Sequence, residues 1–470
     1  MTARESDDGS AGVPAGVSGP VRRVLVIGAG IAGLTAANVL AQASVEAVVL
    51  EARDRIGGRL YTADLDGWPA DLGGSWIHTP AGNPLSAFAE LAGVPRRSAN
   101  PLPELGAFDC AEGRRLSAAE VAASLDLQME GFPAAQDRLT AELGPYATAA
   151  DGIEAFVAQA GLAPAPARRA RQALHALIEA ESASATADQS LRWMWHEAEY
   201  GGDYFGDVPV GGYRPLVEAL AAGLDLHLGV EVTEIAHSAD GVRVRCADGR
   251  VEEGSHAVVT VPLGVLKRGG PRFSPALPPG RRAAIARLGF GRYEKVAMRF
   301  AEPFWRDAGF PHLMIFPRDP ADPAVWAFGQ DAFGGGPVLV FHVFHSAAGQ
   351  LLGMTPDEAV QWARGLVSEA TGRPCPVPAQ AAVTAWAAYR FSGGAYTHIP
   401  PGAEPADADL LGEPVGGRLL FAGEHTQSAR LAYADGAMAS GLREARRLLG
   451  WAAVPLGPIP AAPTAEMSDT

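Results

Sequence analysis

The chain has 470 residues, of which 48% are hydrophobic, and this is enough for two or three domains with large apolar cores. Its net charge of −15 argues against a nucleic-acid partner, because such a partner normally requires a basic face. Cys110, Cys246 and Cys375 are far apart and have no metal-ligand spacing, which favours a reducing compartment, no structural disulfide and no metal site.

The first twenty residues are polar and acidic, and they lack the basic start and apolar run of a signal peptide. We therefore expect a disordered lead over residues 1–20 and, from its Ala/Pro-rich composition, a disordered tail over residues 451–470. The tail is too short and broken to span a bilayer. These features predict a soluble cytoplasmic protein without a membrane partner.

A nucleotide-binding fingerprint follows the lead. The apolar run Val24–Ile27 predicts a strand buried on both faces, and it ends at the sequence GAGIAG. Gly28 allows a tight turn, Gly30 allows backbone to approach a pyrophosphate, and Gly33 allows the next helix to lie close to the strand. The amino end of that helix favours an anion.

A second predicted strand, Ala47–Leu50, ends in Glu51, whose carboxylate can accept hydrogen bonds from a ribose. The segments RDRIGGRLYT (53–62) and DLGGSWIH (71–78) follow, and FAGEHT (421–426) stands near the other end of the chain. NAD enzymes do not need the first of these segments. Together they resemble the FAD-dependent amine oxidase family, which contains monoamine oxidases, polyamine oxidases and lysine-specific histone demethylases. The resemblance covers most of residues 21 to 450.

The resemblance implies an FAD site built from both ends of the chain. In the family the GGR segment crosses the FAD pyrophosphate, so Arg59 is expected at the phosphates, where its planar donors suit an anion. The amino end of the helix starting near residue 433 is expected to face the flavin ring. The residues implied at FAD are Gly28, Gly30, Gly33, Glu51, Arg53, Gly57, Gly58, Arg59, Gly74, Ser75, Trp76, Val232, Trp386, Gly423, Glu424, Tyr433 and Ala434.

One position departs from the monoamine oxidase pattern. In those enzymes a cysteine just before a conserved tyrosine forms a thioether to the flavin. Ala395 occupies that position here and has no nucleophilic sulfur. The cofactor is therefore expected to be FAD held by non-covalent contacts.

Three residues carry the chemistry that the resemblance implies. Tyr396 and Tyr433 match the two aromatic residues that flank the amine in front of the flavin, where their faces guide the substrate and exclude water. Lys295 matches the family lysine that reaches the flavin through a water. An ammonium there would stabilise negative charge formed during oxygen reduction.

The acidic segment WHEAEYGGDYFGD (195–207) is less specific. Carboxylates of Glu197 and Glu199 would bind the distal ammonium of a diamine, whereas an acidic loop in solvent is an equally good interpretation. His78 lies where polyamine-type enzymes place a residue that contacts substrate.

The predicted fold class is α/β with two domains. A Rossmann-like FAD-binding domain is expected from residues 21–95, 224–285 and 386–450, with strands over 229–235, 242–246 and 257–263. A substrate-binding domain of sheet and helices is expected from residues 96–223, which read mostly helical, and 286–385. The latter segment contains predicted strands over 293–300 and 338–344 and a helix over 356–370.

The predicted reaction is oxidation of an amine to an imine, which hydrolyses to an aldehyde, while O₂ is reduced to H₂O₂. The paired tyrosines favour a primary monoamine as the substrate, and the acids and Lys295 leave polyamine oxidation as the alternative. A desaturase, a dehydrogenase of a specialised metabolite and an L-amino acid oxidase remain further alternatives. The expected partners are a small-molecule amine and O₂, in a monomer or homodimer. Absence of a long coiled-coil insertion and of a basic surface argues against a demethylase.

Overall fold

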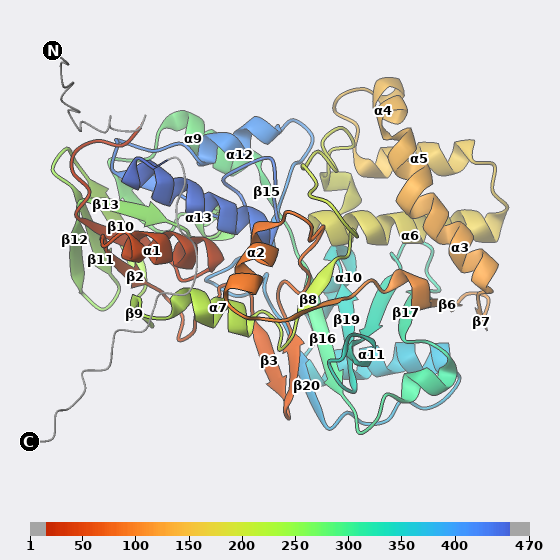
Figure 1. Cartoon of the computed structure of the whole chain (residues 1–470). Coiled ribbons are helices and arrows are strands. Elements are labelled where there is room, and N and C mark those ends of the chain that lie inside the picture. Colours follow the sequence, from red (N-terminus) through yellow and green to blue (C-terminus); the bar gives the residue numbers. More distant parts are fainter. Residues whose placement is uncertain (1–15, 452–470) are drawn as a thin grey trace, which may run out of the picture.

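The computed structural model describes residues 16–451, whose helices and strands form an α/β fold in two halves (Figure 1). Most of the lead and tail predicted to be disordered, residues 1–15 and 452–470, lies outside the described residues. Within the described part of the lead, Val17 is buried and the Ser18 N–H donates to the Gly417 carbonyl.

A five-stranded parallel sheet forms the centre of one half. Its strands, in spatial order, are β22 (Leu419–Phe421), β13 (His256–Val259), β1 (Arg23–Ile27), β2 (Glu46–Leu50) and β9 (Asp225–His227). The strand predicted over 257–263 is shorter than expected and ends at Val259. Pro262 then begins the short helix α8 (Leu263–Lys267), because proline has no N–H to continue a ladder.

The two faces of this sheet are covered differently. Val24 and Val26 of β1 pack in the core that contains helices α1 (Ile31–Gln42) and α13 (Ala434–Leu449), which lie side by side in Figure 1. Leu25 and Ile27 point to the opposite face, toward a second sheet. This alternation is the period-two pattern of a strand buried on both faces.

The second sheet has the order β12 (Val251–Gly254), β11 (Val242–Cys246), β10 (Val232–His237) and β14 (Arg272–Ser274). Strand β11 has the predicted bounds, whereas β10 begins three residues later than the predicted start at residue 229. Gly229 lies before it with a φ of +71°, a turn conformation, and its N–H donates to the Arg53 carbonyl.

A seven-stranded sheet dominates the other half. Its order is β20 (Gln380–Val383), β16 (Glu294–Arg299), β19 (Val338–Val343), β18 (Val325–Gly329), β17 (His312–Phe316), β6 (Leu105–Asp109) and β7 (Arg114–Arg115). Strands from the segments 96–223 and 286–385 therefore share one sheet. Helix α11 (Pro356–Thr371) packs on one face, while α3 (Ala118–Asp126) and α6 (Pro164–Ser182) pack on the other.

Further helices and short strand pairs complete the described chain. The segment 96–223 is mostly helical as predicted, with α4 (Phe132–Leu143), α5 (Ala149–Gln159), α7 (Arg214–Ala221) and the π-helical turn η2 (Leu127–Gly131). The other helices are α2 (Pro84–Leu91), α9 (Pro279–Arg287), α10 (His345–Leu351) and α12 (Pro405–Leu411). The short pairs are β3 (Thr62–Leu65) with β4 (Trp68–Asp71), β5 (Arg96–Ser98) with β8 (Asp207–Pro209), and β15 (Gly289–Phe290) with β21 (Thr397–His398). Within residues 16–451, no helix combines the length and apolar content needed to cross a bilayer.

Strand β16 connects the two halves. Val296 and Met298 point into the core beneath α11, so the alternate residues Lys295 and Ala297 point to the opposite face. Ala297 packs against the β3–β4 hairpin, and Lys295 bonds to the chain just after it. Strand β16 thus places Lys295 at the boundary between the seven-stranded sheet of one half and the Rossmann-like half that contains the five-stranded parallel sheet.

Candidate active site

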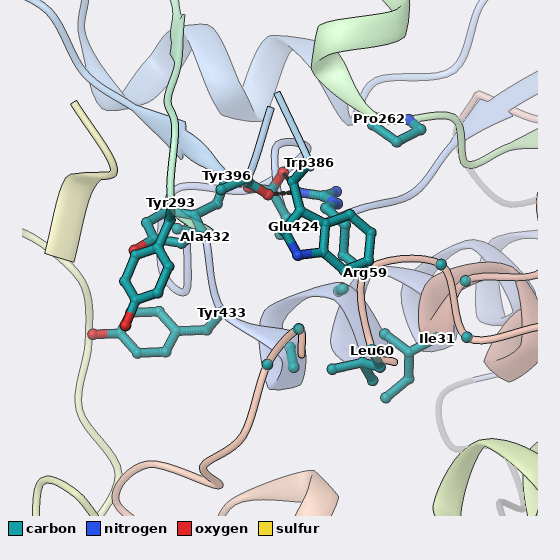
Figure 2. Close-up of a pocket in the computed structure, with 18 of the residues that line it drawn as sticks. Ile31, Arg59, Leu60, Pro262, Tyr293, Trp386, Tyr396, Glu424, Ala432 and Tyr433 are labelled. Atoms are coloured by element: carbon teal, nitrogen blue, oxygen red, sulfur yellow. Dashed lines mark hydrogen bonds and ion pairs between the residues drawn. The ribbon is translucent and has the colours of Figure 1, made fainter. Parts of the chain in front are cut away.

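A cavity of about 640 Å³ lies at this boundary, with walls that are mostly apolar. The glycine loop, Lys295, and the amino end of α13 all contribute to it. Figure 2 shows Tyr293, Tyr396 and Tyr433 grouped at one end, with Trp386, Arg59 and Glu424 next to them. A boundary between domains is a usual place for a ligand site. Of the residues implied at FAD, all line this cavity except Gly33.

The glycine loop has the geometry that the fingerprint predicts. Gly28 has a φ of +109°, and a Cβ there would lie 2.6 Å from the Thr260 Oγ1. A Cβ on Gly33 would lie 2.1 Å from the Gly28 carbonyl oxygen, so a larger residue would push α1 away from β1. A Cβ on Gly30 would meet nothing within 4 Å. The open space at Gly30 therefore lies on the cavity side, where a ligand can approach the backbone.

The surroundings of this loop fit an anionic dinucleotide. Gly30 is the N-cap of α1 and provides no side-chain hydrogen bond, so the first N–H groups of the helix remain available to a phosphate. The Glu51 carboxylate accepts from the N–H groups of Ala29 (2.7 Å) and Arg53 (2.9 Å), which fixes it in the cavity wall. Burial lowers the pKa of the Arg53 guanidinium to about 10, which indicates a cation that gains from a negative ligand.

Arg59 and Glu424 come from opposite ends of the sequence and meet in the wall. Arg59 Nη1 donates to Glu424 Oε1 at 2.8 Å and to the Ala395 carbonyl at 2.7 Å. Burial alone would raise the pKa of Glu424, but the charges of Arg59 and His425 and the hydrogen bonds from Arg59 and Thr397 together outweigh it, and the pKa is lowered. Arg59 is thus held by a carboxylate, while its expected contact with the FAD phosphates stays a prediction.

Lys295 is 4% exposed, and its ammonium lies among three acceptors. Nζ donates to the carbonyls of Asp71 (3.0 Å) and Gly73 (2.6 Å) and to Ser75 Oγ (2.6 Å). Burial lowers its pKa to about 8, although the nearby Asp71 carboxylate raises it. The group is therefore mostly charged at neutral pH and can lose its proton within the physiological range.

The two predicted tyrosines line the same end of the cavity (Figure 2). The Tyr396 hydroxyl donates to the Ala180 carbonyl near the carboxyl end of α6. Tyr433 is the N-cap of α13, and the Arg430 guanidinium lies 4.0 Å from its ring centroid. Arg430 is itself fixed by two bonds of 2.8 Å to Asp435, so the Tyr433 ring has a rigid cationic support.

The three predicted substrate residues are placed differently. His78 lines the cavity, its ring centroid lies 5.6 Å from that of Tyr433, and burial lowers its pKa. Glu197 lies outside this cavity and lines a smaller one beside it. Glu199 is exposed and lines neither.

Several cavity residues have no counterpart in the sequence prediction. Glu181, at the end of α6, accepts from the Tyr204 hydroxyl, and burial raises the pKa of its carboxyl to about 7. Tyr293 bonds through its hydroxyl to His342 Nδ1 at 2.6 Å, and both residues line the cavity. Glu181 stands in no short motif, and only its helical spacing from the apolar Leu177, four residues earlier, could have placed it there.

Comparisons with known proteins agree with this geometry. The family model described as flavin containing amine oxidoreductase matches residues 31–449, which is most of the chain. The chain belongs to this family. Its members are flavin-containing amine oxidoreductases, so the cofactor is FAD and the chain is an oxidoreductase of this family.

Curated relatives were found in plants. Lysine-specific histone demethylase 1 homolog 3 of Oryza sativa subsp. indica is 35% identical over 446 residues, which cover 90% of this chain and 54% of the relative. Lysine-specific histone demethylase 1 homolog 1 of Arabidopsis thaliana is 34% identical, covering 91% and 52%. Protein FLOWERING LOCUS D of Arabidopsis thaliana is 33% identical, covering 90% and 55%. The chain spans about half the length of these relatives.

These relatives contradict two predictions. The predicted partners were limited to a small-molecule amine and O₂ and excluded nucleic acid, and the predicted location was the cytoplasm. Both conflict with relatives that are named histone demethylases. For the location, the lack of a signal peptide does not distinguish the cytoplasm from the nucleus. For the partners, the physical error lies in the use of the net charge, because −15 is a sum over the chain and does not describe any one surface. The argument against a demethylase had the same weakness.

Proposed function

We propose that the protein oxidises the carbon–nitrogen bond of an amine whose reacting end enters the cavity between Tyr396 and Tyr433. A primary monoamine is favoured over a polyamine. The single observation that carries the proposal is the presence of both tyrosines and Lys295 in the wall of one cavity with the glycine loop. Family membership supports amine oxidation as the reaction class, whereas the identity of the amine is proposed from the cavity.

When bound, FAD supplies the redox chemistry, taking a hydride from the α-carbon of the amine and passing the electrons to O₂. The side chains do the remaining work. Tyr396 and Tyr433 orient the amine and exclude water, and their hydroxyls stay protonated because burial raises the pKa of each well above its ordinary value. The Lys295 ammonium supplies positive charge where negative charge develops during oxygen reduction.

The neutral form of the amine is the reactive form, since its nitrogen lone pair is then free. The Arg430 guanidinium against the outer face of Tyr433 supports this selection. A cation already on one face of an aromatic ring reduces the attraction of the other face for a second cation. The cage therefore favours a neutral amine over its ammonium form.

A second candidate comes from the names of the relatives, which are lysine-specific histone demethylases. In that case the amine is the methylated side-chain nitrogen of a lysine in a peptide. The chemical step is the same oxidation of a carbon–nitrogen bond, so the cavity chemistry does not distinguish the two candidates. The two candidates differ in the size of the substrate and in whether the amine is part of a peptide.

The test is anaerobic mixing of the FAD-loaded protein with benzylamine, tyramine, putrescine, spermine, an L-amino acid and a methylated-lysine histone peptide. The readout is bleaching of the visible flavin band. Rapid bleaching by benzylamine or tyramine supports the favoured substrate class, and bleaching by the peptide but not by its unmethylated control supports the second candidate. If none of these compounds bleaches the bound flavin, the proposal fails and the desaturase-like alternative takes its place.

A further inference from the structure

A second cavity of about 30 Å³ lies beside the active-site cavity. The two cavities share Glu181, Ala432 and Tyr433 in their walls, so the small one lies directly behind the aromatic cage. Glu197 and Gln189 also line it, together with Ser182, His196, Thr397 and His398. We call this space the side chamber. Neither the oxidation of a primary monoamine nor the expected FAD site uses it.

Among residues 16–451, no lysine or arginine contacts the two carboxyl groups of the side chamber. Burial raises the pKa of Glu181 to about 7, and the hydroxyls of Tyr204 and Tyr433, which bond to it, are neutral. Burial likewise raises the pKa of Glu197 to about 7, and the His196 imidazole 3.5 Å away is kept neutral because burial lowers its pKa. The Arg430 charge acts on Glu197, but its guanidinium bonds to Asp435.

An amide oxygen in the same wall is an independent sign of a missing donor. Gln189 is only 4% exposed. Its Nε2 donates to the Ser190 carbonyl at 3.3 Å, which orients Oε1 as the remaining acceptor. Among the described residues, Oε1 has no hydrogen-bond partner. A buried acceptor without a donor is destabilising, so the chamber gains from a ligand that donates.

Size and chemistry together define that ligand. A volume of about 30 Å³ holds a group the size of one water molecule, which excludes a guanidinium or a quaternary ammonium but admits an NH₃⁺ group. Two carboxylates and an amide oxygen are best satisfied by a cation that carries several N–H donors. We propose that the side chamber binds an ammonium group, with Glu181, Glu197 and Gln189 as its acceptors.

Two sources can supply this group. Oxidation of a primary amine followed by imine hydrolysis, R–CH=NH + H₂O → R–CHO + NH₃, releases ammonia, which takes up a proton in water. Alternatively, the distal ammonium of an α,ω-diamine reaches the chamber while its other end lies in the cage. Binding of ammonium as such does not depend on the proposed function, but the identity of its source rests on that function.

The first test uses ammonium chloride with the FAD-loaded protein, against sodium chloride and tetramethylammonium chloride at equal ionic strength. Binding is followed by tryptophan fluorescence, since Trp193 and Trp195 line the chamber, and by the thermal midpoint. We expect a saturable response to ammonium only. Glu197→Gln and Gln189→Met should each weaken it about tenfold, whereas Glu199→Gln, a change at an exposed acid outside both cavities, should leave it unchanged.

The second test compares anaerobic flavin bleaching by diamines and monoamines of equal chain length. A diamine that binds at least tenfold tighter than its monoamine, with the preference lost in Glu197→Gln, identifies the distal group as the source. Saturable ammonium binding without a diamine preference identifies the free ion. The proposal is overturned if ammonium gives no saturable response, or if Glu197→Gln and Gln189→Met respond to ammonium as strongly as the native protein does. Absence of bleaching by every amine refutes the proposed function alone, because ammonium binding is measured without turnover.

Discussion

Lys295 shows how a single residue joins structure and chemistry. Its ammonium bonds to two carbonyls and a hydroxyl of the segment after β4, so it supports the cavity wall as well as facing the cavity. Lys295→Met keeps the length of the side chain but removes the charge. We expect turnover to fall at least 100-fold, roughly the scale of one lost electrostatic contact in a catalytic site, while FAD stays bound. Stopped-flow reoxidation and the flavin-to-protein absorbance ratio measure the two effects.

The matched control is Lys267→Met. Lys267 also donates to three backbone carbonyls, at 2.6 to 3.0 Å, but it does not line the cavity. Loss of the Lys267 ammonium should leave the rate of flavin reoxidation unchanged. Near-normal turnover in Lys295→Met would make the residue structural rather than catalytic.

The pH dependence of reoxidation tests the same charge in the native protein. The pKa of Lys295 is lowered to about 8, mainly by burial, so its ammonium is present below this pH and is lost as the pH rises through it. If that charge assists oxygen reduction, the reoxidation rate is highest below about pH 8 and decreases above it. The measurement is the rate of flavin reoxidation from pH 6 to 10, with Lys295→Met as the flat reference. An equally flat profile in the native protein would mean that the Lys295 charge does not affect the rate of flavin reoxidation.

Ala395 allows a prediction about the cofactor itself. It lines the cavity beside Tyr396 and has no sulfur to form a thioether. Acid precipitation should therefore release all of the flavin into the supernatant, where its absorbance is measured. Yellow colour that stays in the washed pellet would contradict this expectation.

At the scale of elements, the close packing of α1 on β1 depends on Gly33. An alanine Cβ there would lie 2.1 Å from the Gly28 carbonyl oxygen, so the helix would have to move away from the glycine loop. We expect Gly33→Ala to lower the free energy of unfolding by about 1–3 kcal/mol and to weaken FAD binding at least tenfold. Denaturant unfolding and fluorescence titration with FAD measure these changes.

The control for that variant is Gly365→Ala in the exposed middle of α11, where a Cβ meets nothing within 4 Å. This change should stabilise the protein by about 0.5–1 kcal/mol, because alanine favours a helix over glycine. FAD affinity should stay the same. If both variants behaved alike, the contact with Gly28 would not be the cause.

Elements that carry a local signal could be predicted from the sequence. Strands β1 and β11 and helix α11 lie within one residue of their predicted bounds, because apolar periodicity and turn residues mark them. The start of β10 and the end of β13 differ because Gly229 and Pro262 redirect the chain. The partner of Glu181 could not be found in this way, since the Tyr204 hydroxyl that donates to it is 23 residues away.

At the scale of the whole molecule, the FAD cavity is assembled from segments that are distant in the sequence. The bond from Arg59 to Glu424 joins residues 365 positions apart, and Trp386 Nε1 donates to the Leu72 carbonyl across 314 positions. The family resemblance placed Arg59, Glu424 and Trp386 together at an FAD site but predicted neither hydrogen bond, and composition gave no information about them. The net charge of the chain also gave no information about partners, because a partner binds to a surface that is only a small part of the molecule.

Because so many distant segments line the cavity where FAD is expected, removal of the cofactor should loosen the whole fold. A ligand that binds only the folded state at 100 times its Kd stabilises that state by about 2.7 kcal/mol. For a chain of this size, that corresponds to a rise in thermal midpoint of roughly 3 °C when FAD is restored to the apoprotein. The measurement is differential scanning calorimetry of apoprotein with increasing FAD. FMN, which lacks the adenylate half, should stabilise less, because contacts at Glu51 and Val232 are then unused. Equal midpoints with and without FAD would mean that the segments hold together independently of the cofactor.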